Sequence, residues 1–112
     1  MNLQQEALQG YTLLSILDER IDAHNSAELK DYLLGLLEKG NTQIIVNLGK
    51  VRFIDSSGLG ALLSGQKNSL AKSGKLVLTN IQTQVYSMFE LTRLNRVFEI
   101  FADVDAVLKS GS

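Results

Sequence analysis

The chain has 112 residues, which suffices for one domain with a hydrophobic core and is too short for two such domains. Its residues are 45% hydrophobic and 21% charged, which excludes the low hydrophobicity and high charge of disordered chains. A formal net charge of -1 argues against nucleic acid or an anionic membrane as a partner, and the absence of cysteine excludes disulfides and thiolate metal sites.

The N-terminal part of the chain predicts a β-hairpin followed by a helix. Residues 3–8 and 11–17 carry enough apolar and β-prone side chains for two strands, with Gly10 in the turn between them. The run Asn25-Ser26-Ala27-Glu28 places a capping side chain three positions before a glutamate, which is the pattern of a reciprocal capping box at a helix start. Leucines then recur at helical spacing as far as Leu37.

Two apolar strands and two helices are expected in the middle of the chain. Residues 43–48 and 75–79 are short apolar runs, and the first is typical of a central strand covered on both faces. A helix is expected after Asp55, and residues 82–91 show helical spacing again. The expected apolar side of the first of these helices comprises Leu59, Leu62, Leu63 and Leu70, its polar side comprises Gln66, Lys67, Asn68 and Lys72, and the apolar positions of the second are Val85, Met88, Phe89 and Leu91.

The C-terminal part predicts a short edge strand within residues 97–101, and Asp103 is placed to cap a last helix. The final residues, within 109–112, are small and polar and are expected to be disordered. Strands alternating with helices predict a single α/β domain over residues 1–112, with helices packed against a mixed sheet that the N-terminal hairpin opens. With neither a leader pattern nor an apolar run long enough for a membrane span, we expect a cytoplasmic protein that does not enter a membrane.

One segment departs from this regular pattern. In residues 53–60 an apolar stretch meets Asp55, Ser56 and Ser57 and two glycines at the start of a helix. One interpretation is an ordinary helix cap, in which Asp or Ser accepts hydrogen bonds from the first turn and the glycines let the helix pack closely. The other is a functional hydroxyl at the strand ends, where open α/β sheets bind ligands and where a helix N-terminus tolerates a phosphate.

Catalytic and metal-binding interpretations of this segment fit poorly. A serine hydrolase elbow needs Gly-x-Ser-x-Gly, but the position of the first glycine is Ile54 for Ser56 and Asp55 for Ser57. The sole histidine, His24, is far upstream. One histidine without cysteine cannot form a zinc site, and Gly58-Leu59-Gly60 lacks the third glycine of a dinucleotide loop. We therefore expect no catalytic residue, no metal and no cofactor.

The sequence resembles the anti-sigma factor antagonists and the wider STAS domains. The run Val51-Arg-Phe-Ile-Asp-Ser-Ser-Gly-Leu-Gly60 is similar to the phosphorylation loop of that family. The segment from Ile21 to Asn25, with Leu29-Lys30 after it, is similar to the family's entry into its first helix. The resemblance extends over essentially the whole chain in the order of elements and implies the STAS fold.

The resemblance also implies a partner switch controlled by phosphorylation. The unmodified domain would bind an anti-sigma factor or related serine kinase, phosphorylation of Ser57 would weaken that binding, and a metal-dependent serine phosphatase would reverse it. The positions expected near the partner or a weakly bound nucleotide are Asp22, Asn25, Asp55, Ser56, Gly58, Leu59 and Leu63. In place of the glycine usual in the family, this chain has Asp18-Glu19-Arg20, which leaves the partner's identity open. The alternative is a docking subunit of a transporter or of a stress-sensing complex.

Overall fold

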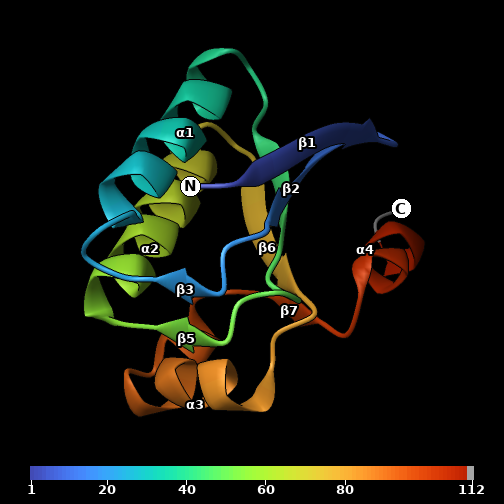
Figure 1. Ribbon diagram of the computed structural model, residues 1–112. Helices are drawn as coiled ribbons and strands as arrows, with labels where there is room; N and C mark the ends of the chain where they lie inside the picture. The colour runs from blue at the N-terminus through green and yellow to red at the C-terminus, as the bar shows by residue number, and fades with distance from the viewer. Residues whose placement is uncertain (111–112) are drawn as a thin grey trace.

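The computed structural model describes residues 1–110 (Figure 1). In chain order, its elements are β1 (Leu3–Leu8), β2 (Tyr11–Ile16), β3 (Arg20–Ile21), α1 (Ser26–Glu38), β4 (Gln43–Asn47), β5 (Phe53–Ile54), α2 (Ser56–Ala71), β6 (Lys75–Thr79), α3 (Thr83–Leu91), the 3-10 helix η1 (Leu94–Arg96), β7 (Ile100–Phe101) and α4 (Val104–Ser110). Within these residues, no helix has the length and apolar character needed to cross a membrane.

The main sheet has the strand order β1-β2-β4-β6-β7. Strands β1 and β2 are antiparallel, and every other neighbouring pair is parallel. The predicted hairpin and mixed sheet are therefore confirmed, with β4 in the centre as its apolar run indicated. Strand β7 lies at the edge as expected, but only Ile100–Phe101 pairs with β6, so the strand is shorter than predicted.

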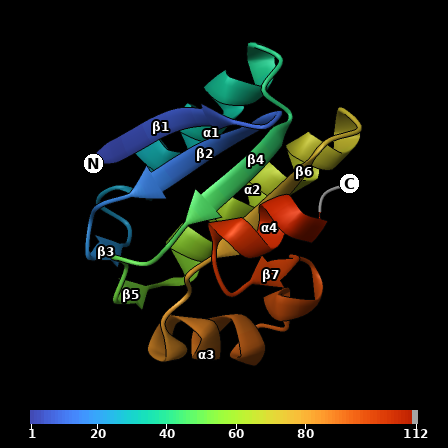
Figure 2. The ribbon, with the colours of Figure 1, turned by 90° about the vertical axis from the view of Figure 1, so that its right-hand side faces the viewer.

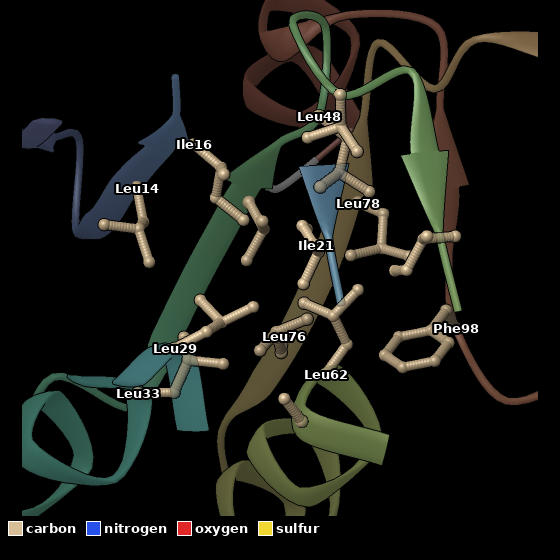
Figure 3. Packing of buried hydrophobic residues seen from close by; sticks show 14 of the residues in the cluster. Leu14, Ile16, Ile21, Leu29, Leu33, Leu48, Leu62, Leu76, Leu78 and Phe98 are labelled. Atoms are coloured by element: carbon tan, nitrogen blue, oxygen red, sulfur yellow. The ribbon is translucent and has the colours of Figure 1, made fainter. Parts of the chain in front are cut away.

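Helices cover both faces of this sheet. Figure 1 shows α1 and α2 on one side and α4 on the other. The larger core cluster fills the space beneath α1 and α2, and Figure 3 shows Leu14, Leu29, Leu33, Leu62 and Leu76 converging there. A smaller cluster, formed by Leu13, Ile45, Val77 and Val107, lies between the sheet and α4. Because successive strand residues face opposite sides, each central strand contributes to both clusters.

A second, two-stranded sheet was not predicted. Strands β3 and β5 pair in parallel, with Arg20 opposite Phe53 and Ile21 opposite Ile54. Ile21 and Ile54 are both buried and join the larger cluster, and Figure 1 shows the two strands side by side near the start of α2. The pairing brings the loop after β2 and the loop after β4 together just ahead of the two helices.

Three residues lie on the opposite side from the one predicted. Gln66, expected on the polar face of α2, is buried, because its amide accepts from the backbone N–H of Leu76 at 2.8 Å and donates to the carbonyl of Val97 at 3.2 Å. Leu70 and Leu91, expected in the core, are 55% and 79% exposed. Both leucines are near the C-terminal end of their helix, and neither belongs to a core cluster.

The helix ends agree with the sequence in part. Helix α1 begins where expected, but the capping box is wrong, because Asn25 makes no side-chain cap and Glu28 instead binds the N-terminal ammonium group at 3.2 Å. Asp103 accepts from the backbone N–H of Ala106 at 2.8 Å, so the predicted cap of α4 is confirmed. Lys109 and Ser110 belong to α4 rather than to a disordered end, and residues 111–112 lie outside the described residues.

Candidate functional site

Asp55 organises the start of α2. Its Oδ1 atom accepts hydrogen bonds from the backbone N–H of Ser57 at 2.9 Å and of Gly58 at 3.1 Å, which satisfies two donors of the first helical turn. The same oxygen accepts from the Ser57 hydroxyl at 2.6 Å. The predicted helix cap is thus confirmed with Asp55 as the capping residue, and the cap also fixes the position of the Ser57 hydroxyl.

The two serines differ in their surroundings. Ser56, the first residue of α2, is exposed, whereas Ser57 is half-buried and tied to Asp55. The hydrogen bond from the Ser57 hydroxyl, followed by the one from the Gly58 N–H, lowers the pKa of Asp55. Asp55 is therefore a carboxylate at neutral pH, and Ser57 is held as its donor.

A second carboxylate lies at the end of the neighbouring strand. Asp22 follows β3 just as Asp55 follows β5, and the backbone N–H of Asp55 donates to the carbonyl of Ile21 at 3.2 Å. The backbone N–H of Ala23, in the Asp22 turn, also lowers the pKa of Asp55, but less than the bonds from Ser57 and Gly58 do. Two negatively charged side chains thus come from segments that are far apart in the sequence.

Asn25 holds the Asp22 turn instead of capping α1. Its Oδ1 atom accepts from the backbone N–H of Asp22 at 2.9 Å, and its Nδ2 group donates to the carbonyl of Arg20 at 2.8 Å. Asp22 in turn accepts from the N–H of His24 at 3.0 Å, which is the main cause of its lowered pKa, and the Arg20 guanidinium lowers it further from 3.5 Å. The role of Asn25 is to shape this turn.

Gly58 allows α2 to approach β3 closely. A Cβ atom at this position would lie 2.7 Å from Ile54 Cγ1, 2.8 Å from Ile21 Cγ2 and 2.9 Å from the carbonyl oxygen of Ile21. Contacts of this length do not occur for real side chains, so only glycine fits without displacing β3. Gly58 is therefore a packing residue that sets the spacing between Ser57 and the Asp22 turn.

The apolar docking residues predicted around Ser57 need correction. Leu59 is 2% exposed and belongs to the larger core cluster, so it cannot offer a partner its side chain, and Gly58 is buried as well. Leu63 is half-buried against the same cluster. The exposed apolar residue of this region is Phe53, which is 40% exposed and carries the Arg20 guanidinium 4.1 Å above its ring. Sequence periodicity missed Phe53 because a two-residue strand is too short to show which face is buried.

The site holds one oriented hydroxyl and two carboxylates. His24 approaches Asp22, with 3.4 Å between its Nδ1 atom and the carboxylate, and within residues 1–110 no imidazole contacts Ser57. Nor do the described residues contain a group of three or more acidic, His or Cys side chains that could hold a metal ion. The site thus combines a half-buried hydroxyl, held by Asp55, with the neighbouring Asp22 turn.

Comparison with known proteins identifies the family. The STAS domain family matches residues 4–107. The chain belongs to this family. Among characterised STAS relatives, the anti-sigma-B factor antagonist of Bacillus subtilis is 26% identical over 103 residues, which cover 91% of this chain and 94% of that protein.

Solved structures show the same STAS fold. An anti-sigma factor antagonist from Mycobacterium paratuberculosis matches with a TM-score of 0.85 at 19% identity, covering 97% of this chain and 92% of that one. SpoIIAA in its unphosphorylated form matches with a TM-score of 0.74 at 20% identity, covering 97% and 96%. A sulfate transporter family protein from Wolinella succinogenes also shares the fold, with a TM-score of 0.79 at 18% identity and coverage of 94% and 87%.

Proposed function

We propose that this STAS domain is an anti-sigma factor antagonist whose affinity for its partner is switched by phosphorylation of Ser57. The observation that carries the proposal is the 2.6 Å hydrogen bond from the Ser57 hydroxyl to Asp55, at the junction of β3, β5 and α2. The names of the relatives support the antagonist role, and the fold is shared with a Bacillus protein, SpoIIAA, known in both an unphosphorylated and a phosphorylated form.

Phosphorylation would add negative charge at one point of an already acidic site. A phosphoryl group adds about -1.5 to -2 charges and removes the proton that Ser57 donates to Asp55. The new dianion would lie beside the Asp55 carboxylate and near the Asp22 turn. A partner surface that fits the neutral hydroxyl would then have to desolvate a cluster of negative charge, so binding weakens.

The fold should survive the modification. Negative charge at a helix N-terminus is favourable, since the positive end of the helix macrodipole faces it. The backbone donors of Ser57 and Gly58 still reach Asp55, and the core beneath α2 does not include the hydroxyl. The switch therefore changes affinity without refolding.

The test combines modification with binding. The purified chain is incubated with ATP and the anti-sigma-factor-type serine kinase from the same genome, and the modified position is located by mass spectrometry. We expect phosphate on Ser57, unchanged kinase binding by Ser57→Ala, and binding weakened about tenfold or more by Ser57→Asp. Ser56→Ala and Ser56→Asp are the matched controls, because Ser56 is adjacent but exposed and makes no bond to Asp55.

Two results would contradict the proposal. The first is phosphate on Ser56 with none on Ser57. The second is equal partner affinity for Ser57→Ala and Ser57→Asp. Amide chemical shifts before and after phosphorylation test the absence of refolding, because changes should be confined to the Asp22 turn and the first turn of α2.

Docking to a transporter or stress-sensing complex is the alternative function. The Wolinella structure shares the fold, but a likeness at 18% identity does not extend to function. The two functions predict different partners for the same binding assay. A partner that binds Ser57→Ala and Ser57→Asp equally, and that is a transport ATPase rather than a serine kinase, would favour the docking role.

A further inference from the structure

A row of polar side chains crosses the main sheet on the face that carries α4. Gln4 pairs with Ser15, Ser15 with Asn47 and Asn47 with Thr79, so these four residues are neighbours on successive strands. The preceding row on the same face, Leu13, Ile45 and Val77, is apolar and packs under α4 through Val107. This face of the sheet thus changes from an apolar row to a polar row toward the carboxyl ends of the parallel strands.

Except for Thr79, this polar row lines a cavity of about 380 Å³ at the carboxyl ends of β2 and β4, and Ile16, Leu17 and Gly49 line it as well. Gln4, Ser15 and Asn47 form its floor, and Lys50 and Asn80 come from the loops that follow β4 and β6. Figure 2, which faces this side, shows α4 in front of β6 with no helix in front of β1 and β2. The volume of the cavity lies in the range of small-molecule sites. The carboxyl ends of parallel strands are also where open α/β sheets bind ligands.

Asn80, which lines this cavity, has an unusual backbone angle and, among residues 1–110, an unpaired side-chain oxygen. Its φ angle is 59°, in the left-handed region, and its Oδ1 atom is buried and accepts no hydrogen bond from the described residues. The unpaired oxygen is unfavourable for folding, whereas asparagine adopts a positive φ angle more readily than most other non-glycine residues. A buried polar atom left unpaired in a folded protein calls for an explanation, and Asn80 is one of the residues that line the cavity.

The charge of the cavity indicates the ligand. Lys50 is exposed and, within residues 1–110, takes part in no ion pair. An ammonium group beside several amides and a hydroxyl suits a small molecule that carries one anionic group and several hydroxyls. We infer that this cavity is a binding site for a small polyhydroxylated anion, of the sugar phosphate or sugar acid class, separate from the Ser57 loop.

Titrations followed by amide chemical shifts test the site. The probes are ribose 5-phosphate, a sugar phosphate, and gluconate, a sugar acid, and each combines several hydroxyls with one anionic group. Ribose, which has only the hydroxyls, and inorganic phosphate, which has only the anionic group, are the controls. We expect one of the two polyol anions to give saturable shifts at Gly49, Lys50 and Asn80 at millimolar concentrations, and each control to bind more weakly. Lys50→Met should weaken binding about tenfold, whereas Lys67→Met, on the other side of the sheet, should not.

A second variant separates binding from stability. Asn80→Gly removes the unpaired oxygen and suits the positive φ angle, so its unfolding midpoint should equal or exceed that of the parent chain while polyol anion binding is lost. The site is refuted if neither polyol anion gives saturable shifts or if inorganic phosphate binds equally well. It is also refuted if the shifts centre on residues 55–59, or if Lys50→Met and Asn80→Gly bind like the parent. None of these outcomes depends on phosphorylation of Ser57.

Discussion

Replacing Gly58 with alanine tests whether close packing of α2 against β3 builds the switch site. Alanine is favoured over glycine inside a helix by about 1 kcal/mol, so the helix alone would gain from the change. Against this, the new methyl group would lie 2.9 Å from the Ile21 carbonyl oxygen and closer still to two isoleucine side chains. That oxygen accepts from the N–H of Asp55 and cannot retreat without weakening the β3–β5 pairing.

Overpacking of this kind costs about 1–3 kcal/mol, so after the helix gain of about 1 kcal/mol we expect Gly58→Ala to lose up to about 2 kcal/mol of unfolding free energy. Gly60→Ala is the matched control in the same helix, because no atom lies within 4 Å of its added Cβ. It should gain up to about 1 kcal/mol. Urea denaturation of both variants and of the parent chain measures the difference. Equal stability of the two variants would show that Gly58 does not set the spacing.

Three further predictions concern the buried amide of Gln66, the contrast in burial between Leu62 and Leu70, and the titration of Asp55. Gln66→Ala should cost about 2–3 kcal/mol, because it leaves the Leu76 N–H without its acceptor, while its exposed neighbour Lys67→Ala should change the free energy of unfolding by less than about 0.5 kcal/mol. Leu62→Ala should cost about 3 kcal/mol in urea denaturation and Leu70→Ala far less, and similar losses for both would contradict the burial described. The pKa of Asp55 is lowered by folding, so its stabilisation is present at neutral pH and is lost as the pH falls below about 4. Asp55→Asn should therefore flatten the acid limb of a plot of unfolding free energy against pH, and an unchanged limb would assign that limb to other carboxyl groups.

Much of the fold could be predicted from periodicity. The hairpin, the central strand and the helix starts are each marked by a local pattern of several residues, and the structure confirms them. Strands β3 and β5 escaped prediction because each has two residues and their pairing partners are distant in sequence. The buried face of α2 runs through Gly65, Gln66 and Ser69 and leaves Leu70 exposed, and the spacing of the apolar residues alone does not indicate this face.

In the candidate site, too, the features set by neighbouring residues could be predicted and those set by distant parts of the chain could not. The Asp-Ser-Ser-Gly string identified the helix cap and the hydroxyl, since capping chemistry is local. The role of Asn25 was misjudged because a capping pattern does not reveal that the side chain is already bonded to the preceding turn. Leu59 lies on the buried side of α2, as its apolar spacing predicts, but this burial in the core rules out the partner contact that was also expected of its side chain.

The pairing of β3 with β5 makes Ser57 part of a conformational epitope. A short synthetic peptide spanning residues 51–60 would contain the serine and Asp55 but would lack the Asp22 turn and the Ile21 carbonyl that receives the Asp55 N–H. A kinase that recognises this arrangement would modify the folded domain and not unfolded or nascent chains. Phosphorylation would then be confined to molecules that are able to bind the partner.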